Sequence, residues 1–164
     1  MEGESELAVV FERRLWQGSV QPDAPAGGDE SRLELNVIFT SIPATLLALQ
    51  RASELARDLD GRIRLLVPQV VPYPLPLTSP PALEEFTERR FHDVAAGQTT
   101  ETLVEICLCR DAETVLARKL KPCSLVVIGG RHTWRPTAEK AMAKKLRQAG
   151  HQVIFAFPER NRDA

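Results

Sequence analysis

The sequence has little that would mark a membrane, secreted or metal-binding protein. No apolar run approaches the roughly 18 residues of a membrane span, and the first residues are acidic, without the apolar stretch of a signal peptide. The chain has three cysteines, Cys107, Cys109 and Cys123. Zinc sites usually use two C-x₂-C pairs, and neither pair is present here. We therefore expect a cytoplasmic chain with no membrane insertion, whose thiols are plain buried side chains.

Motifs of phosphate binding and of catalysis are also missing. Neither G-x-x-x-x-G-K-[ST] nor a G-x-G-x-x-G after the first predicted strand occurs. No nucleophile stands with a base, and the net charge of −1 gives no general attraction to nucleic acid. The sequence thus predicts a protein that is not an enzyme, has no catalytic residues, metal or resident cofactor, and binds no nucleic acid.

The 164 residues suffice for one domain with a core of its own. Residues 1–32 form an acidic, partly flexible segment by composition, with seven acids against two arginines in the first thirty. Part of it, residues 7–16, fits a short strand or a helical turn. Residues 33–158 carry the periodic pattern of a folded domain, and residues 159–164 form a tail.

Strand-like and helix-like segments alternate through this domain. Strands are predicted at 33–40, 62–71, 102–109, 124–128 and 152–157. Helices are predicted at 43–60, 82–96, from Asp111 to about residue 120, and 137–149. This alternation predicts right-handed crossovers and a doubly wound, five-stranded parallel α/β sheet.

Ligands of such sheets bind beyond the carboxyl ends of the strands where strand order reverses, here between the first and fourth strands. Two loops reach that point, and their candidate ligand-binding residues are Thr40, Ser41, Gly129, Gly130, Arg131, His132 and Arg135. Glycine pairs and a helix N-terminus can hold an anion. Two interpretations stay open: an anion or nucleotide site, or a structural turn with a solvated basic rim.

Three further residues are candidates for interaction with a partner. Trp134 either covers a partner surface or a base, or packs over the end of the sheet. Lys140 and Lys144 belong to the outer face of the last helix, which either is simply solvated or contacts an acidic partner.

Residues 109–116, 124–132 and 145–156 are together similar to universal stress proteins. Residues 109–116 (CRDAETVL) and 124–132 (SLVVIGGRH) resemble the third and fourth strand region of that family, and residues 145–156 (KLRQAGHQVIFA) resemble its closing helix and strand. The resemblance covers about residues 33–158. It implies a sheet of order 3-2-1-4-5, like that of the adenine nucleotide alpha hydrolases. It also implies a homodimer through the last strand and a regulatory role in stress response.

Some members of the family bind ATP through an acid after the first strand and a G-x₂-G-x₉-G-[ST] loop after the fourth. This chain departs from both, because Thr40 and Ser41 follow the first strand, His132 replaces the second glycine, and Glu139-Lys140 stand where Gly-Ser is expected. We therefore expect a non-catalytic regulatory or partner-binding module that does not bind ATP in the family manner. The alternative is a small-ligand sensor that binds a nucleotide or another anion at residues 129–137.

Overall fold

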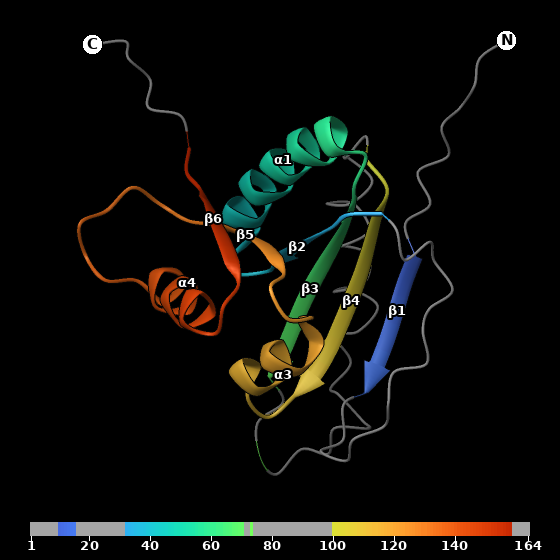
Figure 1. The fold of residues 1–164 in the computed structure, drawn as a ribbon. Helices are drawn as coiled ribbons and strands as arrows, with labels where there is room; N and C mark the ends of the chain where they lie inside the picture. Colours follow the sequence, from blue (N-terminus) through green and yellow to red (C-terminus); the bar gives the residue numbers. More distant parts are fainter. Residues whose placement is uncertain (1–9, 16–31, 71–72, 74–99, 159–164) are drawn as a thin grey trace, which may run out of the picture.

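The computed structural model describes residues 10–15, 32–70, 73 and 100–158. They form one all-parallel sheet in the order β1-β4-β3-β2-β5-β6 (Figure 1). The strands are β1 (Val10–Leu15), β2 (Glu34–Ile38), β3 (Arg62–Val70), β4 (Thr102–Cys109), β5 (Leu125–Gly129) and β6 (Gln152–Ala156). The helices are α1 (Ile42–Leu59), α3 (Ala112–Lys119) and α4 (Ala138–Gln148).

The five strands β2 to β6 confirm the predicted doubly wound sheet of order 3-2-1-4-5. The central strand β2 pairs with β3 on one side and with β5 on the other, so the order reverses there as expected. The sheet also has a sixth strand that the five-strand prediction did not include. This strand, β1, pairs with β4 from Val10↔Leu103 to Leu15↔Leu108. The predicted helix at 82–96 lies outside the described residues.

The helices cover the two faces of the sheet separately (Figure 1). Helix α1 packs on one face with Leu35, Val37, Leu65 and Val127 beneath it, and its own buried stripe runs through Ala48, Leu49, Ala52 and Ala56. Helices α3 and α4 cover the other face, where they pack on Ile38, Leu66, Val126 and Ile128. Alternate residues of β2, β3 and β5 therefore serve opposite cores, as expected of parallel strands covered on both sides.

The helix boundaries follow from local capping. Each helix begins after a residue whose side-chain oxygen accepts a hydrogen bond from a backbone amide in the first turn: Ser41 for α1, Asp111 for α3 and Thr137 for α4. Helix α1 ends at Asp60, which adopts the left-handed conformation. All three lie within one or two residues of the predicted spans.

The cysteines divide into two groups. Cys107 and Cys109 are buried on the α3 face of β4, as the sequence predicts. Cys123 is exposed in the turn before β5, contrary to the expectation of buried thiols, because this turn lies outside the sheet and places Cys123 at a positive φ of 58°. Within the described residues, no helix is both long and apolar enough to span a membrane.

Candidate functional site

The predicted site lies where β2 and β5 end side by side. Thr40 and Ser41 leave β2, and Gly129 ends β5 with Gly130 next in the chain. The fold thus brings the two candidate loops together, as the order of the strands requires. These loops can hold a ligand only if they leave free space and backbone amides that have no partner within the protein.

The space beside Gly129 is filled by the backbone of α1. A Cβ atom on Gly129 would lie 1.7 Å from the backbone oxygen of Ala44 in the first turn of α1. Only a residue without a side chain lets the helix approach the end of β5 so closely. This glycine is therefore needed for helix–strand contact, and its surroundings are filled by the protein itself.

Gly130 is also explained by packing. A Cβ atom there would lie 2.2 Å from the Phe155 ring, and the Gly130 amide donates a hydrogen bond to the Ala156 carbonyl at 3.0 Å. Above the strands the aromatic rings continue: Phe155 and Phe157 lie 4.7 Å apart, and His132 stacks on Phe157 at 4.0 Å. This aromatic stack occupies the end of β5 and β6, and the Gly130 amide is already used.

The N-terminus of α1 has few amides left for an anion. Pro43 has none, the Ala44 amide donates to the Ser41 hydroxyl oxygen at 3.4 Å, and the Thr45 amide donates to the Ser41 carbonyl at 2.8 Å. Helix N-termini bind phosphate through amides that point outward without a partner. In α4, Glu139 lies in the first turn and would repel an anion.

One polar atom at the site is buried without a partner. The Thr40 hydroxyl oxygen accepts and donates no hydrogen bond among the described residues, although the Thr40 amide donates to the Thr45 hydroxyl oxygen at 3.3 Å. A single hydroxyl beside β2 can orient a small polar molecule or a water. It does not by itself provide the charge that a triphosphate needs.

The loop between β5 and α4 projects away from the sheet (Figure 1). Lys140, in the first turn of α4, reaches back and donates to the carbonyl oxygens of Thr133 and, at 3.3 Å, of Arg135. The Arg135 amide donates to the Thr133 hydroxyl oxygen at 3.2 Å. The intervening Trp134 is 88% exposed, so it does not pack over the end of the sheet.

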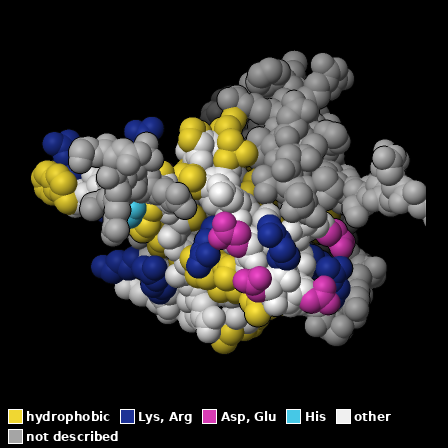
Figure 2. Space-filling view, turned by 90° about the horizontal axis from the view of Figure 1, so that it is seen from above, with side chains coloured by type: hydrophobic (Ala, Val, Ile, Leu, Met, Phe, Trp, Pro, Cys, Tyr) yellow, Lys and Arg dark blue, Asp and Glu magenta, His cyan; other side chains and the backbone are white. Residues whose placement is uncertain are grey.

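The candidate residues therefore separate in space into an interior group and a surface group. Gly129 and Gly130 are buried in packing contacts. Arg131, Trp134 and Arg135 are exposed on the loop, and Lys144 is exposed on α4. Figure 2 shows an outlying hydrophobic side chain at the projecting end of the molecule with Lys and Arg side chains beside it, while the acidic side chains in view lie elsewhere.

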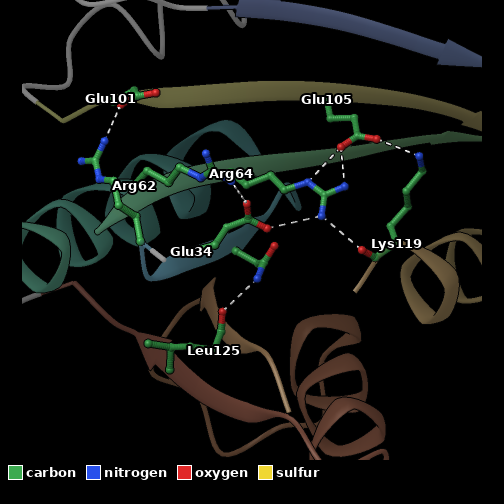
Figure 3. Close-up of polar contacts among 9 residues, drawn as sticks. Glu34, Arg62, Arg64, Glu101, Glu105, Lys119 and Leu125 are labelled. Atoms are coloured by element: carbon green, nitrogen blue, oxygen red, sulfur yellow. Dashed lines mark hydrogen bonds and ion pairs between the residues drawn. The ribbon is translucent and has the colours of Figure 1, made fainter. Parts of the chain in front are cut away.

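A buried ionic cluster on the α3 face was not predicted from the sequence (Figure 3). Glu105, 2% exposed in β4, accepts two hydrogen bonds from Arg64 of β3 at 2.9 and 2.5 Å. Its other oxygen lies 2.8 Å from the Lys119 ammonium at the end of α3. Arg64 also donates to the Lys119 carbonyl at 3.1 Å and lies 3.6 Å from Glu34. The cluster joins three strands to one helix.

The charges of this cluster shift the pKa values of Glu105 and of its neighbour Cys107. Burial by itself raises the pKa of Glu105, but Arg64 and Lys119 outweigh burial and hold that pKa below its usual value. Next to it in β4, burial first and the Glu105 carboxylate second raise the pKa of Cys107 to about 12. Cys107 is therefore a neutral thiol at physiological pH and a poor nucleophile.

A glutamate inside the apolar run of residues 102–109 (TLVEICLC) was the signal for this cluster. A carboxylate in a strand covered on both faces must have buried cationic partners. Arg64 in the run of residues 62–67 (RIRLLV) gave the complementary signal. Among the described residues, no three His, Cys, Asp or Glu side chains group as metal ligands.

Comparison with known proteins supports the fold and leaves the activity open. No protein-family model and no curated protein matches the sequence. The universal stress protein UspA from Lactobacillus plantarum matches over 77% of this chain and 99% of its own, with 16% identity and a TM-score of 0.53. A universal stress protein family member from Burkholderia pseudomallei matches over 78% and 98%, with 19% identity and a TM-score of 0.53.

A third solved structure, a universal stress protein in complex with cAMP, matches over 76% of this chain and 95% of its own, with 17% identity and a TM-score of 0.46. The first two similarities show that this chain has the universal stress protein fold, as its sequence motifs suggested. At such identities the fold is shared, while ligands and activities are not carried over.

Proposed function

We propose that this chain is a non-catalytic regulatory or partner-binding module on the universal stress protein fold, and that it does not bind ATP in the family manner. The observation that carries the proposal is the packing at the point where strand order reverses. Gly129 lies against the backbone of Ala44, and the Gly130 amide is used within the sheet. A triphosphate needs close backbone approach and several free amides. Gly129 is filled by packing, and the amides of Gly130, Ala44 and Thr45 are already bonded within the protein.

Nucleotide binding tests this proposal directly. A site with a Kd of about 10 µM would stabilise the protein by about 2.7 kcal/mol at about 1 mM ligand, which is a rise of several degrees in Tm. We expect no such rise and no saturable heat in calorimetry with MgATP. Stoichiometric binding of ATP to protein purified without nucleotide would refute the proposal.

The second candidate function is a sensor of a small anion at the loop 129–137. It is favoured by the exposed Arg131 and Arg135 and by the buried, unpartnered hydroxyl of Thr40. If this function is right, a screen of nucleotides and small anions will give a ligand-induced rise in Tm. The double substitution Arg131→Gln, Arg135→Gln will abolish that rise, and an unchanged rise would contradict this candidate.

We further propose a homodimer through β6, in the cytoplasm. The outer edge of β6 pairs with no strand among the described residues, and such edges associate readily. The Gln152 amide donates inward to Ser124, so the next amide, of Val153, faces outward. Val153→Pro removes that outward donor and spares the bonds to β5. Sedimentation velocity should show a dimer that this substitution dissociates; a monomeric parent protein would refute the proposal.

A further inference from the structure

Trp134 is an unusual surface residue. The residue is 88% exposed, although the indole is the largest apolar group that a protein can bury. Among the described residues, Arg135 lies against its ring, with the guanidinium carbon 5.4 Å from the ring centroid. An indole left in water beside a cation is a typical centre of binding energy in protein interfaces.

The backbone that carries Trp134 is held in place on both sides. One ammonium group, that of Lys140, binds the carbonyl oxygens of Thr133 and Arg135, the residues before and after it. Thr137 caps α4 immediately beyond. Ordering a loop reduces affinity, and a loop that is already ordered avoids this loss. Trp134 is therefore displayed on a preorganised turn.

The exposed charged side chains of this loop and of α4 are all positive. Arg131 and Arg135 are exposed on the loop, and Lys144 is exposed one helical turn beyond Lys140 on the same face of α4. Glu139 is the one acid in the sequence from 131 to 147. Lys145 pairs with Glu113 of α3 instead. We call Arg131, Trp134, Arg135 and Lys144 the Trp134 surface.

We propose that the Trp134 surface docks an acidic peptide segment of a partner protein, in which an apolar side chain covers the indole and carboxylates meet the three cations. The inference deepens the proposed partner-binding function and rests on it. Charge complementarity selects acidic segments. A peptide fits better than nucleic acid, because single strands are bound along a basic groove with successive aromatic platforms. Trp134 is the one aromatic ring of this surface, and the exposed rings of His132 and Phe157 are stacked on each other.

A labelled peptide tests the proposal. The probe is a 12-residue Asp/Glu peptide with one central leucine, titrated by fluorescence anisotropy at low salt; the control peptide has Lys in place of each acid. We expect saturable binding of the acidic peptide and no binding of the Lys control peptide. Trp134→Ala should weaken it about tenfold or more, and Arg131→Gln with Arg135→Gln should weaken it and flatten its salt dependence. Lys121→Gln, an exposed cation before β5, is the matched control and should change nothing.

Lys140 is a positioning residue in this proposal. In a Trp16→Phe background, Lys140→Met should increase the local motion of Trp134 in time-resolved fluorescence anisotropy of the free protein and weaken the peptide as well. No binding of the acidic peptide, equal loss in Lys121→Gln, or tighter binding of a single-stranded oligonucleotide would each overturn the inference. These results leave the proposed function standing, because ATP binding in calorimetry is what refutes that function.

Discussion

Replacing Glu105 by glutamine tests how strongly the buried ionic cluster holds β3, β4 and α3 together. The substitution keeps the shape of the side chain and removes its charge. The partners that remain, Arg64 and Lys119, are themselves only 13% and 8% exposed, so water replaces little of the lost interaction. Removing one partner of a buried ion pair costs about 3–5 kcal/mol.

Two features move the expectation for Glu105→Gln to the lower end of that range. Arg64 keeps the Lys119 carbonyl and the more distant Glu34, and the glutamine oxygen can still accept one hydrogen bond. We expect a loss of about 3 kcal/mol at pH 7, measured by urea unfolding with circular dichroism. The matched control is Glu113→Gln, which breaks the exposed pair with Lys145 and should cost under about 1 kcal/mol.

The contribution of Glu105 to the free energy of unfolding should decrease in acidic solution. Because the pKa of Glu105 is lowered in the folded protein, its contribution is complete above the usual glutamate value of 4.5 and is lost as pH falls through the folded pKa. The difference between parent and Glu105→Gln should therefore be constant from pH 7 to about pH 5.5 and shrink in more acidic solution.

A triple variant gives the sharpest check on this cluster. Glu105→Leu, Arg64→Met and Lys119→Met together remove every charge of the central triad and fill the space with apolar groups. Such replacements are often neutral or stabilising, so the triple variant should be more stable than Glu105→Gln. A loss for Glu105→Gln no larger than for Glu113→Gln would contradict a stabilising role of the buried cluster. So would a parent–variant difference in stability that does not change with pH.

Three further predictions concern packing, capping and thiol chemistry. Gly129→Ala should cost about 3 kcal/mol or more in urea unfolding, because its Cβ would meet the Ala44 backbone; a loss below about 1 kcal/mol would contradict that contact. Thr137→Ala should cost about 1 kcal/mol by removing the cap of α4, whereas Thr137→Ser should be nearly neutral. A thiol reagent at pH 8 should label Cys123 rapidly in the folded protein and Cys107 only after denaturation, because Cys107 is buried and its pKa is raised to about 12; equal labelling rates would count against this assignment.

The fold was predictable because its determinants are local. Asp111 and Thr137 cap helices through amides three residues ahead, and this relation is visible in the sequence. The apolar runs before Gly129 and through β6 identify strands covered on both faces. Strand order needed more than periodicity, and the resemblance to universal stress proteins supplied it. The pattern of residues 7–16 fits either a strand or a helical turn, and six residues of mixed pattern do not show that β1 pairs with the edge strand β4.

The site was less predictable because its meaning depends on distant residues. The Gly129-Gly130 pair is compatible with an anion site until Ala44 and Phe155 are placed against it, and those residues are far away in the sequence. Likewise, the sequence cannot decide whether Trp134 is covered or exposed. Glu105 is different, since a lone charge in an apolar strand indicates buried cationic partners from the sequence alone.

The position of Lys140 has a consequence for local stability. The ammonium that holds the loop belongs to the first turn of the helix that the loop precedes. Helix ends open more readily than helix centres. When that first turn opens, the loop loses the hydrogen bonds from Lys140 to the carbonyl oxygens of Thr133 and Arg135. We therefore expect the turn and the loop to open together. The free energy of opening this one helical turn thus determines how often the exposed indole leaves its ordered position.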